Sequence, residues 1–425
     1  MKKIETQYFL IGYSVAAWWG GRSIRDNDRM GLITAVTEES MLYSRPLITY
    51  SLGKRTDSLS YHGNISEPCD VKVCYDLRVE RLDGNKKTAS LSDGSEVIFD
   101  KALIATGGIP IVPDIPGREV QGGIFPFTRR DDMEAIDTYL KAHSSKNIVI
   151  LGGGFIGLKT CEAMMDMKKN ITLIELTPRL LQNMMDEKGS SYLEKSLIRS
   201  GVHVIKEDTI VAFEGEKGSL TDVLLKSGRR IPADVAVISI GVRPNLDWLR
   251  SSGIEINRGI VVNEFQETSC PGIYAAGDVA ETRNLLTGER NVVAIWPEAV
   301  NQGRIAGWNM SGRIESYPGS LPMNAMEIGE KALVSAGVAN PVGDDYEVLI
   351  RKDRENYKKL VLKDDLIVGV IFVGEIEKSG IYINLMRQML PVQTFRDKML
   401  DPNFGLINLP TNYRKHLVRG AGIEV

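Results

Sequence analysis

Cysteine and histidine are scarce in this sequence, and their scarcity excludes several kinds of site. The 425 residues include four cysteines and four histidines. No two cysteines have the C-x-x-C spacing of a zinc site or of a thioredoxin-type redox pair. The histidines are His62, His143, His203 and His416, and they form no recognisable catalytic arrangement. We therefore expect neither a metal site nor acid–base catalysis by histidine.

The cysteines also bear on the cellular compartment. A chain of this length with only Cys69, Cys74, Cys161 and Cys270 fits the reducing cytoplasm, where disulfides are rare. Cys69 and Cys74 are five positions apart beside a stretch that alternates between apolar and polar residues. We interpret them as strand and turn residues and not as a redox pair.

Long charge blocks and long apolar runs are missing as well. The formal net charge is −3 without a block of one sign, which argues against nucleic acid as a partner. Two short basic clusters, residues 351–354 and 414–416, are interpreted as solvated faces, although they could meet an acidic carrier protein. The apolar run from Tyr8 to Trp19 is interrupted by Gly12 and is too short to cross a bilayer, so we expect no membrane span and no export.

What the sequence does contain is a βαβ pattern near its start. Apolar periodicity predicts a strand, a helix and a second strand over residues 8–37. The first turn has the small residues Gly12, Ser14 and Ala17 where a dinucleotide motif usually has three glycines. Glu38 follows the second strand, at a place where an acidic residue can bind a ribose. This unit is either a degenerate dinucleotide site or a purely structural βαβ unit.

A second βαβ unit carries the strongest motif in the chain. Residues 147–151 and 170–175 predict two strands, and the sequence G-G-G-F-I-G between them opens a helix. The first glycine of such a motif permits a tight turn, the second lets the backbone approach a pyrophosphate, and the third lets helix and strand pack closely. The helix N-terminus offers N–H groups to the phosphates. The predicted dinucleotide site comprises Gly152, Gly154, Phe155, Ile156 and Gly157.

Glu175 ends the second of these strands and predicts the choice of nucleotide. Its carboxylate can accept hydrogen bonds from both ribose hydroxyls and would repel the 2′-phosphate of NADP. Residues 176–178 supply no cation to offset that repulsion, and Arg179 is the one nearby residue that could weaken the inference. We expect NADH to be preferred over NADPH.

β-Rich stretches with turn signals follow each βαβ unit, leading to residues 97–106 and 235–240, and they are interpreted as inserted meanders. Beyond about residue 320 the pattern changes to short strands within residues 346–373 and an amphipathic helix at 381–388. These elements predict a separate α+β domain.

With these motifs in place, the chain resembles the pyridine nucleotide-disulfide oxidoreductase superfamily, and within it the rubredoxin reductase, ferredoxin reductase and nitrite reductase-like flavoproteins. The resemblance extends over nearly the whole length. Beside the two dinucleotide turns, it rests on Y-S-R-P at 43–46, L-I-A-T-G at 103–107, G-V-R-P-N at 241–245, G-I-Y-A-A-G-D at 272–278 and W-P-E-A at 296–299.

The resemblance implies an α/β fold of two Rossmann-like dinucleotide-binding domains, as in glutathione reductase, with inserted β-meanders and a C-terminal α+β domain. The FAD-binding domain would comprise residues 1–115 and 245–320, and the NAD-binding domain residues 116–244. The C-terminal interface domain would comprise residues 321–425, and relatives suggest that it could form a homodimer.

The resemblance also implies FAD and NADH as cofactors. The residues expected at FAD are Gly12, Ser14, Ala17, Glu38, Arg45, Ala105, Thr106, Gly107, Gly277, Asp278, Trp296 and Pro297. The residues expected at NADH are Gly152, Gly154, Phe155, Ile156, Gly157, Glu175 and Gly241. Pro297 suits the first turn of a helix whose N-terminus would face the flavin, and we expect Glu298 to cap that helix or to face solvent.

Two positions depart from the pattern of the related reductases, which often have a lysine after the Arg-Pro pair and a glutamate after the I-G-L stretch. Here those places hold Tyr50 and Lys159. We expect both near the nicotinamide and the flavin, with Glu162 one helical turn further on as the candidate partner of Lys159. The alternative is an exposed helix lysine.

Residues 44–46 lie where disulfide reductases of the superfamily place a redox cysteine, and no cysteine is present there. The electron acceptor must then approach the flavin itself. The resemblance implies hydride transfer from NADH to FAD and electron transfer to a small iron–sulfur protein such as rubredoxin or ferredoxin. The alternatives are an NADH oxidase, an accessory reductase within a larger metalloenzyme or redox complex, and a scaffold protein that keeps the flavoprotein fold without catalysis.

Overall fold

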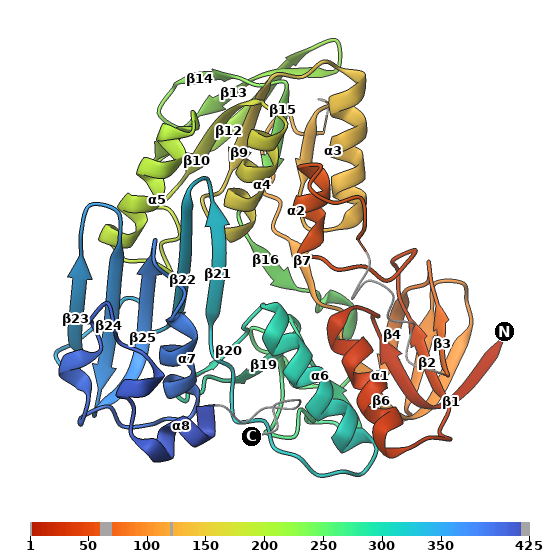
Figure 1. Cartoon of the computed structure of the whole chain (residues 1–425). Helices are drawn as coiled ribbons and strands as arrows, with labels where there is room; N and C mark the ends of the chain where they lie inside the picture. Colours follow the sequence, from red (N-terminus) through yellow and green to blue (C-terminus); the bar gives the residue numbers. More distant parts are fainter. Residues whose placement is uncertain (1, 60–69, 120–121, 418–425) are drawn as a thin grey trace. The chain divides into compact units, whose positions relative to one another are not determined.

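The computed structural model describes residues 2–59, 70–119 and 122–417, and the chain divides into two compact units (Figure 1). The first unit comprises Met1–Ile111, Thr128–Arg130 and Val242–Leu321. The second comprises Val112–Phe127, Asp131–Gly241 and Pro322–Val425. His62 and Cys69 lie outside the described residues.

The first unit is built on a seven-stranded sheet with the order β3-β2-β1-β6-β5-β4, to which β18 adds beside β6. Strands β1, β2, β3, β6 and β18 run parallel to their neighbours, and β4 and β5 form an antiparallel meander with β6. Their bounds are β1 Lys3–Ile11, β2 Ile33–Val36, β3 Val71–Cys74, β4 Val79–Asp83, β5 Thr88–Leu91, β6 Glu96–Ile104 and β18 Ile273–Ala275. Smaller elements of this unit are α2 Leu47–Leu52, β7 Gly108–Pro110, β16 Val242–Pro244, β17 Ile260–Val261, β19 Ala280–Arg283 and β20 Arg290–Asn291.

Two helices of the first unit, α1 (Val15–Asn27) and α6 (Trp296–Met310), lie side by side (Figure 1). Glycines allow their backbones to meet: a Cβ on Gly303 would lie 2.1 Å from the carbonyl oxygen of Ala16, and a Cβ on Gly307 would lie 2.2 Å from that of Gly20. Any larger residue at these positions would force the helices apart. The glycines inside α6 therefore serve packing, although they lower helix propensity.

The second unit begins with a five-stranded parallel sheet in the order β11-β10-β9-β15-β8. Both predicted strands of its βαβ core have the predicted bounds, β9 Asn147–Leu151 and β10 Asn170–Glu175. The other elements are β8 Ile124–Pro126, α3 Arg130–Ala142, α4 Phe155–Asp166, α5 Glu187–Arg199, β11 His203–Lys206, β15 Val235–Ile238 and the antiparallel meander β12 Ile210–Glu216, β13 Ser219–Leu225 and β14 Arg230–Pro232. The α/β class with inserted meanders is confirmed.

The C-terminal part of the second unit is an antiparallel sheet in the order β21-β22-β25-β24-β23, with α7 packed on β25 (Figure 1). The bounds are β21 Met323–Ile328, β22 Lys331–Gly337, β23 Glu347–Lys352, β24 Tyr357–Lys363, β25 Leu366–Val373, α7 Ser379–Arg387 and α8 Thr411–Leu417. The sequence did not indicate β21 and β22, because they are rich in Met, Ala, Glu and Lys, which favour helices. Pairing of β22 with β25, and of β21 with β22, decides their conformation.

Asp186, which precedes α5, gives a prediction about stability and pH. Its carboxylate accepts hydrogen bonds from Gly189 N (2.8 Å), the Tyr357 hydroxyl (2.6 Å) and the Lys359 ammonium (3.0 Å). Burial opposes ionisation of Asp186, but these hydrogen bonds outweigh it and lower its pKa. Asp186→Asn should therefore destabilise the folded protein by about 2 kcal/mol at pH 7, as measured by urea unfolding.

A lowered pKa stabilises the folded state above the pKa of the unfolded state, and this stabilisation is lost as the pH falls through the folded pKa. The difference between the parent protein and Asp186→Asn should accordingly shrink below about pH 4. A difference that does not change with pH would contradict a role for the ionised carboxylate.

Gln266 is fully buried, and neither atom of its side-chain amide has a hydrogen-bond partner within the part of the chain that the structure describes. A buried polar group without a partner costs about 1 to 3 kcal/mol. Gln266→Met keeps the length of the side chain and removes both polar atoms, so we expect it to raise the free energy of unfolding by about 1 kcal/mol. A lower urea midpoint for the variant would show that the amide is hydrogen-bonded in solution.

Candidate functional site

The first unit contains a cavity of about 300 Å³ at the carboxyl ends of β1, β2 and β6. Ligands of α/β sheets bind at this edge. Six of the residues expected at FAD line the cavity, namely Gly12, Ser14, Glu38, Arg45, Ala105 and Thr106. The remaining six, Ala17, Gly107, Gly277, Asp278, Trp296 and Pro297, are not among its lining residues.

The turn from β1 to α1 lines one side of this cavity. Gly12 has a φ of +84°, and a Cβ there would lie 2.5 Å from the carbonyl oxygen of Ala105. Ser14 is the N-cap residue of α1, and its side chain makes no capping hydrogen bond. Ala17 is completely buried in the core beneath the turn. The turn thus brings a helix N-terminus to the cavity beside two small residues, Gly12 and Ser14, while the Tyr13 side chain between them is buried, which fits a pyrophosphate.

Two adjacent carboxylates, Glu38 and Glu39, follow the end of β2 and line the cavity. Glu38 forms an ion pair with Arg129, and Glu39 accepts hydrogen bonds from Arg45 (2.9 Å) and from the Tyr43 hydroxyl (3.2 Å). The sequence singled out Glu38 alone. Glu39 could have been found as its neighbour, whereas nothing in the sequence indicated Arg129, which lies 91 positions away from Glu38.

Arg45 lines the cavity and acts on Asp278 through its charge. Its guanidinium donates to the carbonyl oxygen of Thr128 (3.1 Å) as well as to Glu39. Burial raises the pKa of Asp278, and the positive charge of Arg45 partly opposes this rise. No hydrogen bond from the described residues satisfies the Asp278 carboxylate. A half-buried acceptor without a partner suits the hydroxyl groups of a ribityl chain, so Asp278 fits FAD.

Glu298 does not lie as the sequence suggested. It neither caps α6, whose N-cap is Ile295, nor faces solvent, because only 3% of its surface is exposed. It accepts hydrogen bonds from the Tyr317 hydroxyl and from Leu321 N (3.3 Å). Burial and the neighbouring Glu298 charge raise the pKa of Tyr317. The prediction was wrong because the partners of Glu298 come from a segment about 20 residues further along the chain.

The glycine motif of the second unit has the shape of a dinucleotide turn. Gly152 has a φ of +115°, and a Cβ on Gly157 would lie 1.9 Å from the carbonyl oxygen of Gly152. By contrast, a Cβ on Gly154 would meet nothing within 4 Å. Phe155 and Ile156 begin α4, so its N-terminus faces the open space beside Gly154. That space fits a pyrophosphate.

Glu175 sits directly against this glycine turn. Its Oε2 accepts a hydrogen bond from Gly153 N (2.6 Å), and its Oε1 accepts from Thr177 N (2.7 Å) and from the Thr177 hydroxyl (2.6 Å). Arg179 donates to the carbonyl oxygens of Met185 and Gln182, both at 3.3 Å. The guanidinium is thus held by its own loop. Gly241, with a φ of +124°, follows β15 in the same unit.

The two departures from the related reductases lie in different units. Lys159 and Glu162 form an ion pair on α4, and each is 6% exposed. Lys159 is therefore not an exposed helix lysine. Tyr50 belongs to α2 of the first unit and is 36% exposed.

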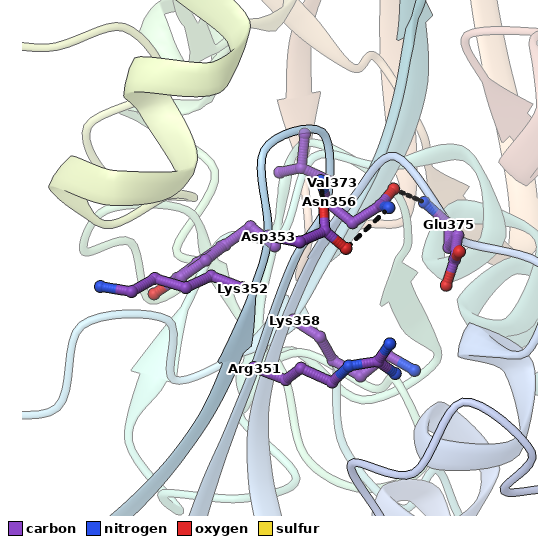
Figure 2. A pocket seen from close by; sticks show the side chains of 8 residues that line it. Arg351, Lys352, Asp353, Asn356, Lys358, Val373 and Glu375 are labelled. Atoms are coloured by element: carbon purple, nitrogen blue, oxygen red, sulfur yellow. Dashed lines mark hydrogen bonds between the residues drawn. The ribbon is translucent and has the colours of Figure 1, made fainter.

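A second hollow, at the β23–β24 hairpin, is too small for a substrate. Figure 2 shows its lining, where Asp353 accepts from the Asn356 side chain (3.1 Å) and Asn356 accepts from Glu375 N (3.2 Å). Its cavity of about 10 Å³ holds at most one water molecule. The basic side chains of Arg351 and Lys358 lie next to each other at its edge (Figure 2).

Neither a cluster of metal-binding side chains nor a helix able to cross a membrane is present among the described residues. No group of three or more His, Cys, Asp or Glu side chains there is arranged to hold a metal ion. None of the helices described has both the length and the apolar character needed to cross a membrane.

A Rossmann-type turn in each unit, one opening on a cavity and one beside the Glu175 carboxylate, is the arrangement typical of an oxidoreductase that uses FAD and a pyridine nucleotide. Residues 6–303 match the family described as pyridine nucleotide-disulphide oxidoreductase, and residues 322–390 match the rubredoxin NAD+ reductase C-terminal domain. The first match covers more than half of the chain. The chain belongs to the pyridine nucleotide-disulphide oxidoreductase family, and it is an enzyme with FAD and NAD(H) as cofactors.

Similar proteins include the NADH-dependent phenylglyoxylate dehydrogenase subunit epsilon of Aromatoleum evansii, which is 28% identical over 409 residues, 93% of this chain and 95% of that subunit. The nitrite reductase [NAD(P)H] of Bacillus subtilis (strain 168) is 27% identical over 94% of this chain, but this chain spans only 49% of its length. A solved structure, the NAD-dependent persulfide reductase from A. fulgidus, has a TM-score of 0.85 at 24% identity, with 95% of this chain and 80% of that chain covered. It shows the shared fold.

Proposed function

We propose that this enzyme takes a hydride from NADH and passes the electrons to a small iron–sulfur protein such as rubredoxin or ferredoxin. FAD, when bound, accepts the hydride and releases electrons singly. We assign FAD to residues 1–115 and 245–320, NADH to residues 116–244, and interface contacts to residues 321–425.

The residues of the chain then act by binding and orientation. In the first unit the Gly12 turn and the α1 N-terminus hold the pyrophosphate, Glu38 binds the adenosine ribose, and Arg45 neutralises negative charge near Asp278. In the second unit Gly154 leaves space for the pyrophosphate of NADH and Glu175 receives its ribose. No side chain needs to act as an acid or a base in hydride transfer.

The observation that carries the proposal is that, among the residues the structure describes, no cysteine lines the cavity of the first unit. The carboxylate of Glu39 in this cavity accepts hydrogen bonds from Tyr43 and Arg45. Of the cysteines that the structure describes, Cys161 and Cys270 are buried in packed cores, and burial raises the pKa of the Cys161 thiol. Cys74 ends β3 and packs against the core of the first unit. Without a thiolate to relay electrons, an external acceptor must take them directly.

Two further observations support the choice of acceptor and compartment. The match of residues 322–390 to a rubredoxin NAD+ reductase domain supports an iron–sulfur protein as acceptor. The small number of cysteines supports the cytoplasm, where reduced iron–sulfur carriers operate.

A second candidate is a reductase subunit of a larger redox enzyme. It is supported by the similarity over nearly the full length to a subunit of an NADH-dependent dehydrogenase. In this case the same two nucleotide sites would serve, and the acceptor would be an iron–sulfur partner subunit in place of a diffusing carrier.

The test has two steps under anaerobic conditions. The purified protein should show a flavin spectrum that NADH bleaches promptly, and a protein that binds no FAD or does not react with NADH would overturn the proposal. The reduced enzyme is then mixed with oxidised rubredoxin, with oxidised ferredoxin or with air-saturated buffer. Rapid reduction of either carrier supports the proposal. Rapid reoxidation by oxygen alone would indicate an NADH oxidase. Slow reaction with all three acceptors would favour a reductase subunit of a larger redox enzyme.

A further inference from the structure

Most of the hydrogen-bond acceptor positions of the Glu175 carboxylate are already occupied by donors of the protein itself. Its two oxygens offer about four acceptor positions. Three of these are taken, by Gly153 N, by Thr177 N and by the Thr177 hydroxyl. Only one position is left for the two hydroxyls of a ribose. For Glu175 to accept both, one of its present partners must leave.

The Thr177 hydroxyl is the partner that can leave. A hydroxyl has one proton to donate, and the Thr177 oxygen lies within reach of two acceptors, Glu175 Oε1 at 2.6 Å and the carbonyl oxygen of Arg179 at 2.9 Å. Rotation about one bond transfers the hydrogen bond to Arg179 and frees a position on Glu175. The backbone donors, Gly153 N and Thr177 N, have no such alternative.

The place of the Arg179 carbonyl depends on residues 176–186, here called the ribose loop. Within it the Arg179 guanidinium donates to the carbonyl oxygens of Gln182 and Met185. Leu181 N donates to the carbonyl oxygen of Gly153 (3.0 Å), so the loop is also bonded to the glycine turn. The loop has a non-glycine residue, Leu181, at a φ of +51°, and such a conformation persists only where neighbours hold it.

The C-terminal domain supplies those neighbours. The Asn340 amide donates to the carbonyl oxygens of Gln182 (3.2 Å) and Met185 (3.1 Å), the same two oxygens that Arg179 uses. Ser335 donates to the Met184 carbonyl oxygen. Lys359 joins Asp186 at the end of the loop to the Ala339 carbonyl oxygen (2.9 Å), next to Asn340.

We propose that Asn340 is a positioning residue for NADH: it holds the ribose loop so that the Arg179 carbonyl can receive the Thr177 hydroxyl when the ribose displaces it from Glu175. The inference rests on the proposed role of Glu175 as the ribose ligand. In this way a residue of the C-terminal domain takes part in nucleotide binding through the ribose loop.

The test is a double-mutant cycle with Asn340→Leu and Thr177→Val in the full-length holoenzyme. Asn340→Leu removes both donors at nearly constant size, and it should raise the Kd of NAD+, measured by calorimetry, and the KM of NADH by about fivefold. The kcat at saturating NADH should not change. In the Thr177→Val background no hydroxyl needs a second acceptor, so the same Asn340→Leu change should alter the Kd by less than about twofold.

The control is Asn384→Leu on α7, whose side chain in the C-terminal domain accepts a hydrogen bond from Gln388 of its own helix (3.2 Å). It should leave the Kd of NAD+ unchanged. An equal loss of affinity from Asn340→Leu in both backgrounds would overturn the proposal, because Asn340 would then act independently of Thr177. So would an unchanged Kd in Asn340→Leu, or Thr177→Val alone weakening NAD+ more than about fivefold. Failure of the proposed function would appear separately, as a parent protein that NADH does not reduce.

Discussion

Gly12→Ala is expected to leave the protein without tightly bound FAD. The added Cβ would lie 2.5 Å from the Ala105 carbonyl oxygen and 2.9 Å from its carbon, and both atoms belong to the backbone. An L-residue at a φ of +84° adds about 1 to 2 kcal/mol of strain. Relief requires the β1–α1 turn to move away from the end of β6, which widens the phosphate-binding turn. Together these costs are about 3 kcal/mol, so the Kd of FAD should rise on the order of 100-fold.

The matched control is Gly94→Ala. Gly94 has nearly the same φ, +80°, but a Cβ there would meet nothing within 4 Å. This variant carries the strain without the close approach, so it should lose about 1 kcal/mol of stability and keep the FAD affinity of the parent protein. The measurement is fluorescence titration of the deflavinated proteins with FAD. If Gly12→Ala and Gly94→Ala bind FAD equally well, the close approach at Gly12 has no part in cofactor binding.

Glu175→Ala should reduce the preference for NADH. The variant loses the carboxylate to which we assign the ribose of NADH, and it also loses the negative charge that would repel a 2′-phosphate. Hydrogen bonds to charged groups are worth about 1.5 to 3 kcal/mol, so kcat/KM for NADH should fall by about tenfold to a hundredfold. The value for NADPH should stay the same or rise. Arg179 is held by carbonyl oxygens of its own loop, so it should not by itself make NADPH the better substrate.

Glu175 also accepts hydrogen bonds from Gly153 N and Thr177 N. Glu175→Gln tests this structural role separately from the discrimination between NADH and NADPH. The amide oxygen can still accept from one of these two backbone N–H groups, whereas the amide nitrogen cannot accept from the other, and the negative charge is gone. We expect Glu175→Gln to bind NADH only a few-fold more weakly than the parent protein does. The ratio of kcat/KM for NADH to kcat/KM for NADPH should fall. Glu194→Gln, which removes a carboxylate paired with Lys206 in the same unit, is the control for charge alone. Equal losses for both nucleotides in Glu175→Ala would mean that Glu175 only supports the glycine turn.

Several features of the fold could be predicted from the sequence because they depend on neighbouring residues. The bounds of β9 and β10 follow from two short stretches of mostly β-branched and apolar residues, and the glycine turn between β9 and α4 follows from its spacing. The degenerate first turn was also recognisable, since Gly12, Ser14 and Ala17 are small where the backbone must come close. By contrast, β21 and β22 were missed, because their helix-favouring residues become strands only by pairing within the sheet.

The sequence by itself determined the two nucleotide turns, the carboxylate at the end of β10 and the lack of a cysteine between β2 and α2, because each is a short-range pattern. Only the tertiary structure decided which side chains surround them. Arg129 forms an ion pair with Glu38, and the Tyr317 hydroxyl donates to Glu298. The Asn340 amide donates to two carbonyl oxygens of the ribose loop, which lies more than 150 positions earlier in the sequence. Such partners are chosen by geometry and by the cost of leaving buried polar groups unpaired, and neither is visible until distant segments of the chain have packed together.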